Sequence, residues 1–177
     1  FKFFIYTFVG SLFMLLGLAY VAWQHAEQTG DWSFAIKDLT AFAPSLSAEE
    51  QGWILLALLA GLAVKVPLFP LHTWLPLAHN QAPTAGSVNF AAVILKLGLY
   101  GLYVFILPMV PEAVVTWAPT IAVLAVIGIV YAALICWVQT DVKKLIAYSS
   151  VSHMGFAVLG LIALNPIGLQ GSVFYML

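Results

Sequence analysis

The chain has 177 residues, of which 63% are hydrophobic and only 7% are charged. Soluble domains are roughly 45–50% apolar and about 25% charged, so this composition excludes an ordinary soluble globular protein. The net charge is −1 and the sequence has no basic cluster, so it lacks the electrostatic footprint of a nucleic-acid-binding protein. Cys136 is the single cysteine, which excludes an internal disulfide and a cysteine-based metal site.

Charged residues are so sparse that four long stretches contain none. These stretches are 3–26, 66–95, 113–140 and 145–177. Each is long enough to cross a bilayer, because about 20 apolar helical residues span its hydrocarbon core. We predict an all-α fold: a polytopic transmembrane helix bundle with about five complete helices, part of a sixth, and one helix broken by prolines. The lipid bilayer is therefore an expected partner.

Residues 1–177 are predicted to form a single transmembrane domain. In chain order, the predicted spans are about 3–23, 53–75, 83–107, 114–138, 143–164 and a truncated 167–177. The chain opens with Phe1 rather than methionine and stops within an apolar run, so we expect it to be a fragment of a longer polytopic protein.

The predicted loop at 24–51 is the only extended polar stretch, with room for a short surface helix. Within it, Ser47 and Glu50 have the spacing of a capping box that opens the next helix. Lys2, Lys143 and Lys144 fall on one predicted side of the membrane, which the positive-inside rule predicts to be cytoplasmic.

The predicted span 53–75 is interrupted by Pro67, Pro70 and Pro76. Each proline removes an amide donor and clashes with the preceding turn. Such a break at membrane depth is tolerated where neighbouring helices or water satisfy the freed carbonyls, as in transporters near their ion sites. The alternative is that the helix simply ends near Pro67 and a loop follows.

Two lysines lie inside predicted spans. Lys65 and Lys96 are each about 13 residues into a helix, and so roughly 20 Å along it, near the middle of the bilayer. Intramembrane lysines are costly and usually face a protein interior or a wet cavity. A lysine there can change its protonation as a partner approaches or leaves, which a proton relay requires. The alternative is a fixed ion pair that holds two helices together.

No Asp or Glu lies inside any predicted span, so a carboxylate partner for either lysine is expected elsewhere in the longer protein or in a neighbouring subunit. Asn89, Lys96, Tyr100 and Tyr103 recur at spacings of seven, four and three residues. These spacings put them on one face of an ideal α-helix. We predict that this polar stripe lines the interior of the bundle.

Histidines supply further candidates for proton transfer. Ser149, Ser152 and His153 share one face of an otherwise apolar predicted helix. Histidine titrates near neutral pH, so His153 is predicted to be part of a proton relay, with a hydrogen-bonded packing residue as the alternative. His72 and His79 flank the broken region and are candidates for proton access, or else for helix capping or interfacial anchoring.

The sequence contains no glycine-rich phosphate loop, dinucleotide-binding fingerprint, metal-ligand spacing or nucleophile motif. We therefore expect this chain to bind no cofactor or metal of its own and to perform no covalent chemistry.

Several stretches resemble the antiporter-like membrane subunits of respiratory complex I. They are 63–76 (AVKVPLFPLHTWLP), 78–79 (AH), 82–88 (APTAGSV), 94–98 (ILKLG) and 139–155 (QTDVKKLIAYSSVSHMG). Lys96 and the SVSHMG ending are most similar to the chain M branch of this family, the counterpart of mitochondrial subunit four. The resemblance covers most of 53–177 and implies that the chain corresponds to about helices six to eleven of fourteen.

The resemblance also implies a role for each site residue. Lys65 would lie on a discontinuous seventh helix and pair with a glutamate of the fifth helix. Lys96 would be the central lysine of the eighth helix, and His153 a histidine of the tenth. All three would lie on a hydrated axis that crosses the subunit.

The implied function is proton translocation coupled to quinone reduction, within an enzyme whose redox chemistry takes place in other subunits. Those subunits would carry the NADH site, FMN, the iron–sulfur clusters and quinone, and other membrane subunits would be the partners. The favoured location is a bacterial inner membrane, with the mitochondrial inner membrane and the thylakoid left open. The rivals are a subunit of a multi-subunit Na⁺/H⁺ antiporter, the membrane arm of a hydrogenase, and a purely structural role.

Overall fold

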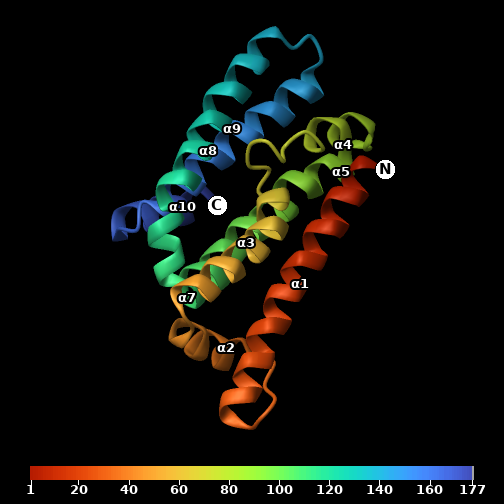
Figure 1. Ribbon diagram of the computed structural model, residues 1–177. Helices are drawn as coiled ribbons and strands as arrows, with labels where there is room; N and C mark the ends of the chain where they lie inside the picture. Colours follow the sequence, from red (N-terminus) through yellow and green to blue (C-terminus); the bar gives the residue numbers. More distant parts are fainter. Residues whose placement is uncertain (177) are drawn as a thin grey trace.

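The computed structural model describes residues 1–176, and every regular element within that range is helical. Figure 1 shows the helices as one elongated bundle. In chain order the elements are α1 Lys2–Thr29, α2 Ile36–Phe42, η1 Ala43–Ser45, α3 Ala48–Lys65, α4 Leu75–Gln81, α5 Thr84–Asn89, η2 Phe90–Ile94, α6 Leu95–Gly101, η3 Leu102–Ile106, α7 Leu107–Met109, α8 Pro111–Val138, α9 Val142–Ile162 and α10 Pro166–Met176. The predicted all-α helix bundle is confirmed.

Four helical stretches are long and apolar enough to cross a membrane. They are Lys2–Thr29, Thr84–Met109, Pro111–Val138 and Val142–Ile162. The first extends beyond the predicted end at 23 and stops at Gly30, whose left-handed backbone (φ 82°) ends α1. The second runs continuously through α5, η2, α6, η3 and α7. Helix α3 is not among the four, because its 18 residues include two glutamates in the first turn and a lysine in the last.

Helices α1 and α3 lie side by side at very short distance, because glycines occupy their contact (Figure 1). A Cβ atom on Gly10 would lie 2.7 Å from the carbonyl oxygen of Ala60, and one on Gly61 would lie 2.8 Å from that of Gly10. Small residues at a helix crossing let the backbones approach and gain packing energy that the hydrophobic effect does not supply in lipid. The two helices therefore form a tight pair.

Helices α8 and α9 form a second antiparallel pair, with a turn between them. The Asp141 side chain caps α9 by accepting hydrogen bonds from the amides of Lys143, at 2.9 Å, and Lys144. The ammonium of Lys143 donates a 3.1 Å hydrogen bond to the carbonyl oxygen of Ala82, just before α5. This contact ties the α8–α9 pair to the segment that links α4 and α5.

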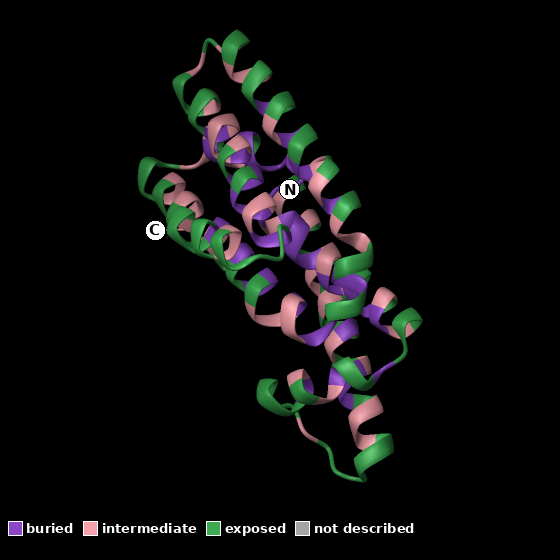
Figure 2. Ribbon diagram, turned by 90° about the vertical axis from the view of Figure 1, so that its left-hand side faces the viewer, coloured by how far each residue is buried: buried purple, intermediate pink, exposed green. Residues whose placement is uncertain are grey.

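Buried side chains gather where the helices face one another, and the outer faces stay exposed (Figure 2). Leu55, Trp74 and Leu99 are fully buried in the core. The exposed faces carry large apolar side chains such as Leu134 and Phe174. An apolar outer face of this kind is typical of a surface that meets lipid or other membrane helices.

The predicted polar stretch 24–51 is more ordered than an open loop. Its first residues complete α1, and α2 supplies the short surface helix for which the sequence leaves room. The predicted capping box is confirmed: Ser47 Oγ accepts from the Glu50 amide at 3.4 Å, and the Ser47 amide donates to Glu50 Oε2 at 3.0 Å. Tyr20 of α1 also donates to Glu50, at 3.0 Å.

The Ser47 hydroxyl also donates to Glu50 Oε2, at 2.6 Å. This hydrogen bond, followed by those from the Ser47 amide and the Tyr20 hydroxyl, lowers the pKa of Glu50. A depressed pKa in the folded state stabilises the fold above the unfolded pKa, and this contribution is lost as pH falls through the lowered pKa. We expect Glu50→Gln, which can keep the capping geometry, to flatten the acidic limb of the stability profile by a small amount. Thermal unfolding of the purified full-length protein, measured from pH 7 down to pH 3, tests this. A mutant profile as steep as that of the unmodified protein would contradict it.

Candidate functional site

The helix that carries Lys65 ends at that residue. Helix α3 stops at Lys65, the residues 66–74 form successive turns, and α4 begins at Leu75. The helix does end near Pro67, as in the alternative interpretation. The residues that follow are not a solvated loop, however, because Val66, Pro67 and Leu68 are buried.

The three predicted breaking prolines have different positions. Pro67 and Pro70 lie within the turns, in line with the prediction. Pro76 does not break a helix: it lies in the first turn of α4, where its missing amide is not needed. The predicted break is therefore confined to 66–74, and Pro76 helps to start the next helix.

Trp74 satisfies a carbonyl group that the break would otherwise leave open. Its indole Nε1 donates a 2.8 Å hydrogen bond to the carbonyl oxygen of Val64, and the ring is fully buried. Phe3 of α1 packs against this ring, with centroids 5.0 Å apart. The sequence analysis did not assign Trp74 a role. A tryptophan placed among prolines inside an apolar segment is the signal that could have identified it, since a buried indole needs an acceptor.

We expect Trp74→Phe to destabilise the folded conformation of 66–74, because the buried carbonyl of Val64 loses its hydrogen-bond donor. An unsatisfied buried polar group costs about 1–3 kcal/mol. The purified full-length protein should therefore melt at a lower temperature than the unmodified protein. Trp137→Phe is the matched control, because Trp137 is 88% exposed at the end of α8. Equal melting temperatures for the two variants would show that this hydrogen bond is not important.

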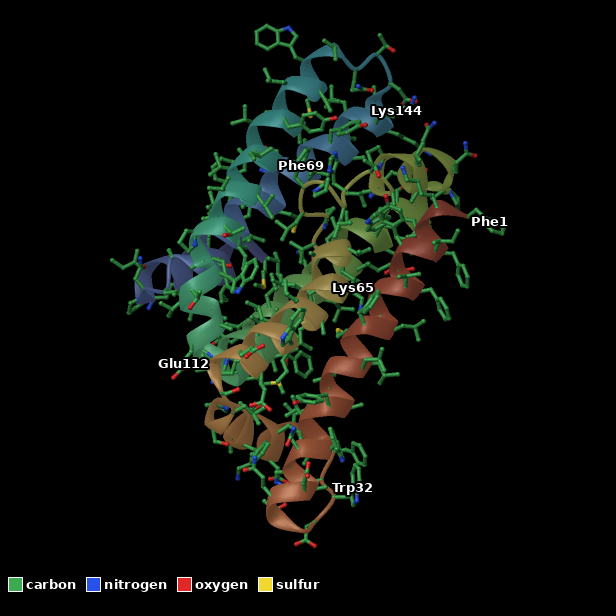
Figure 3. The ribbon with its side chains drawn as sticks, viewed as in Figure 1. Phe1, Trp32, Lys65, Phe69, Glu112 and Lys144 are labelled. Carbon is green, nitrogen blue, oxygen red and sulfur yellow. The ribbon has the colours of Figure 1, made fainter. Side chains whose placement is uncertain are left out.

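Lys65, at the end of α3, lies beside α6, the helix that carries Lys96 (Figure 3). A Cβ atom on Gly98 of α6 would lie 3.0 Å from the Cβ of Lys65, so the two backbones cross in close contact. Lys96 precedes Gly98 by two residues, so the two positions are about 200° apart around the helix axis. The side chain of Lys96 therefore leaves α6 on the side away from Lys65, and both lysine side chains are half-buried.

The predicted polar stripe around Lys96 does not line the interior of the described chain. Asn89, Tyr100 and Tyr103 are all exposed. The prediction assumed an ideal α-helix, but two π-helical turns, η2 and η3, interrupt this helix. A π-turn holds one residue more than an α-turn, so Asn89 and Tyr103 are shifted relative to Lys96. Lys96 and Tyr100 both lie in α6 and keep the α-helical spacing, so the exposure of Tyr100 instead reflects that no described helix covers that face.

The two histidines beside the break are both buried. His72 stacks on Phe69, with centroids 5.7 Å apart, and meets the edge of Tyr131 of α8. His79 packs on Phe90 at 5.8 Å. Among the described residues, His72 Nδ1 and His79 Nε2 have no hydrogen-bond partner. Buried polar atoms are normally paired, so these two nitrogens are exceptions within the described part of the chain.

His79 also lines a hollow of about 240 Å³ between α5 and α9. Thr84, Ser87 and Lys143 contribute to the same wall. Helix α4 lies outside the four apolar spans, and there burial, followed by the positive charge of Lys143, lowers the pKa of His79. Both effects disfavour the protonated form of the His79 ring.

The side chains predicted to share one face of α9, those of Ser149, Ser152 and His153, make hydrogen bonds to different elements. Ser149 and Ser152 donate to backbone carbonyls, the first to Ile146 of its own helix and the second to Ile129 of α8. Neither hydroxyl therefore hydrogen-bonds to His153, although the sequence suggests that they share its face. His153 instead hydrogen-bonds through Nδ1 to the hydroxyl of Tyr175 on α10, at 2.7 Å. The sequence analysis did not identify Tyr175.

The whole chain, residues 1–177, matches the family described as NADH:quinone oxidoreductase/Mrp antiporter, TM. Chain 4 of the NADH-ubiquinone oxidoreductase of Marchantia polymorpha is 46% identical over all of this chain and 34% of its own length. Subunit M of the NADH-quinone oxidoreductase of Rhodobacter capsulatus is also 46% identical, over all of this chain and 36% of its own length. The corresponding Escherichia coli subunit M is 43% identical over 99% of this chain and 34% of its own length.

Solved structures give the same result. A chain of respiratory complex I from Thermus thermophilus superimposes with a TM-score of 0.87 at 32% identity, over 99% of this chain and 36% of that chain. An archaeal membrane-bound sulfane sulfur reductase gives a TM-score of 0.79 at 30% identity, over 97% of this chain and 34% of its own. The Mrp complex from Dietzia gives 0.79 at 22% identity, over 99% and 31%, which shows a shared fold.

The chain spans about a third of the length of the relatives that it matches. The resemblance to the complex I membrane subunits is confirmed, and within it the similarity to subunit M and chain 4. By a match along its entire length, the chain belongs to the NADH:quinone oxidoreductase/Mrp antiporter transmembrane family.

Proposed function

We propose that this chain is the proton-carrying part of subunit M of an NADH:quinone oxidoreductase. One observation carries the proposal: Lys65 ends a helix that breaks inside an apolar bundle, and its backbone packs directly against the helix of Lys96. A lysine in such a place needs a mobile proton or a partner charge. The 43–46% identity to subunit M and chain 4 proteins supports assigning that role to this enzyme.

In the proposed mechanism, electron transfer in other subunits alters the charge or hydration around Lys65. The change makes Lys65 release or accept a proton. The proton then moves through Lys96 toward His153. The two lysine side chains leave their helix crossing on different sides, so transfer between them passes through water or another polar group rather than by direct contact.

His72 and His79 supply access from the end of the bundle that carries Lys2 and Lys143. Both are buried, and each has a ring nitrogen without a partner among the described residues. The lowered pKa of His79 means that a proton taken up by the ring is readily released again, which suits a group that passes protons inward. We assign Asn89, Tyr100, Ser149 and Ser152 to the polar lining of the path. For Asn89 and Tyr100, this assignment requires the rest of the longer subunit to cover their exposed face.

The complex around this subunit would supply NADH, FMN, iron–sulfur clusters and quinone, all bound in other chains. Its immediate partners would be further membrane subunits, and we place it in a bacterial inner membrane. The relatives named as NADH-quinone oxidoreductase and complex I subunits support the assignment to this enzyme.

Purification of the tagged full-length protein from its native membranes tests the proposal. The preparation should reduce quinone with NADH and contain flavin and iron–sulfur subunits, identified by mass spectrometry. Companions that are all hydrophobic, with no redox centre, would instead assign the protein to the multi-subunit Na⁺/H⁺ antiporters. Companions that include a hydrogenase or a sulfur-reducing subunit would assign it to that class of membrane arm.

A further inference from the structure

Helix α10 packs against α9 along one regular face. On α9 this face carries His153, Ala157 and Gly160, and on α10 it carries Gly168, Ser172 and Tyr175. Both sets follow the i, i+4 and i+7 spacing of one helical stripe. The helices are antiparallel, so Gly160 meets Gly168, Ala157 meets Ser172, and His153 meets Tyr175.

The first two contacts hold the stripe in place. A Cβ atom on Gly168 would lie 2.6 Å from the carbonyl oxygen of Gly160, and one on Gly160 would lie 2.8 Å from that of Gly168. Ser172 is 2% exposed and donates a 2.7 Å hydrogen bond to the carbonyl oxygen of Ala157. The end of α10 that carries Tyr175 is therefore positioned by two tight contacts further along the same face.

The third contact joins the two polar rings. Tyr175 Oη lies 2.7 Å from His153 Nδ1, and the ring centroids are 6.0 Å apart. Phe156 stacks on the Tyr175 ring, with centroids 6.4 Å apart. Among the described residues, the tyrosine hydroxyl has no second hydrogen-bond partner. Both side chains are exposed on the outer face of the described chain. A hydroxyl carries one donor proton and a neutral imidazole one acceptor nitrogen, so the pairing that satisfies both within the described residues has Tyr175 Oη donating to His153 Nδ1.

We propose that Tyr175 is a positioning residue for His153, which fixes the neutral imidazole as the tautomer with its proton on Nε2. The inference rests on the proposed role of His153 as a proton carrier. Nε2 already bears a proton in this tautomer, so an incoming proton can bind only at Nδ1, on the side of Tyr175. The hydroxyl therefore decides at which nitrogen the proton enters and at which it leaves. Replacing the Tyr175 hydroxyl with hydrogen leaves both tautomers of His153 available. Proton entry and exit are then no longer assigned to particular ring nitrogens.

Nitrogen NMR of the full-length protein tests the positioning step directly. The protein is labelled with ¹⁵N-histidine and observed in lipid above pH 8, where an ordinary imidazole is neutral. The spectrum of His153→Gln assigns the signal by its loss. We expect a single Nε2–H tautomer in the unmodified protein and a mixture in Tyr175→Phe. Tyr6→Phe, which removes a tyrosine hydroxyl on α1, should leave the signal unchanged.

Transport measurements test the consequence. In the intact complex, Tyr175→Phe should lower proton uptake about fivefold and move its pH profile, and Tyr175→Gln, which retains a hydrogen-bonding group, should restore most of it. An unchanged tautomer in Tyr175→Phe overturns the positioning role, whatever the transport rate. An altered tautomer with unchanged transport in both Tyr175→Phe and His153→Gln would instead overturn the proposed role of His153.

Discussion

Replacing Lys65 by alanine should lower coupled proton transport by about tenfold or more, equivalent to at least ~1.4 kcal/mol in the barrier, while the complex still assembles. The reason is the position of Lys65, the last residue of α3, inside an apolar bundle and against α6. The measurement is proton uptake by vesicles during NADH oxidation, normalised to the amount of assembled complex.

Lys65→Arg separates proton transfer from a purely structural ion pair. Arginine keeps the positive charge but does not release its proton in proteins. If Lys65 merely held two helices together, this variant would work nearly normally, so normal transport would refute the relay. We expect instead a loss close to that of Lys65→Ala. Lys37→Ala is the matched control, since Lys37 is exposed on the surface helix α2.

Gly98→Ala should destabilise the crossing between α3 and α6 and displace Lys65. The added Cβ would lie 2.6 Å from Val66 Cγ2 and 3.0 Å from the Val66 amide nitrogen. Val66 is fully buried and so has little room to shift. Overpacking of this kind costs about 1–3 kcal/mol. Both the melting temperature of the purified protein and its coupled transport should fall.

Gly128→Ala supplies the comparison, because it adds the same methyl group to a buried glycine of another transmembrane helix. There the nearest atom, Phe69 Cβ, would lie at an ordinary 3.7 Å. We expect this variant to behave like the unmodified protein. If both glycine variants are equally impaired, the short contact at Gly98 does not account for the effect.

The sequence predicted the helices well where composition determines them. Predominantly apolar stretches predicted the four long spans, and Ser47 with Glu50 predicted the start of α3. It also located the break, because proline cannot continue a helix. It could not specify where the chain goes after Lys65, since that depends on tertiary contacts such as the hydrogen bond between Trp74 and Val64.

Side-chain directions were predicted less well than helix positions. The stripe through Asn89 and Tyr100 was expected to face the interior, but both residues are exposed in the described chain, because the neighbouring helices determine which face is covered. On α9, adjacent residues point about 100° apart, so Ser152 faces α8 while His153 faces α10. The role of Tyr175 depends on the angle between two helices, which periodicity within one helix does not contain.

The glycine contacts on both sides of α3 restrict how Lys65 can respond to a change of charge. Gly10 of α1 lies against Gly61 and Val64, and Gly98 of α6 lies against Lys65 and Val66. The last turn of α3 is thus clamped between two backbones and cannot tilt without collisions. If the positive charge at this position moves, either the flexible lysine side chain changes its conformation or the proton leaves it. The helix backbone itself stays in place.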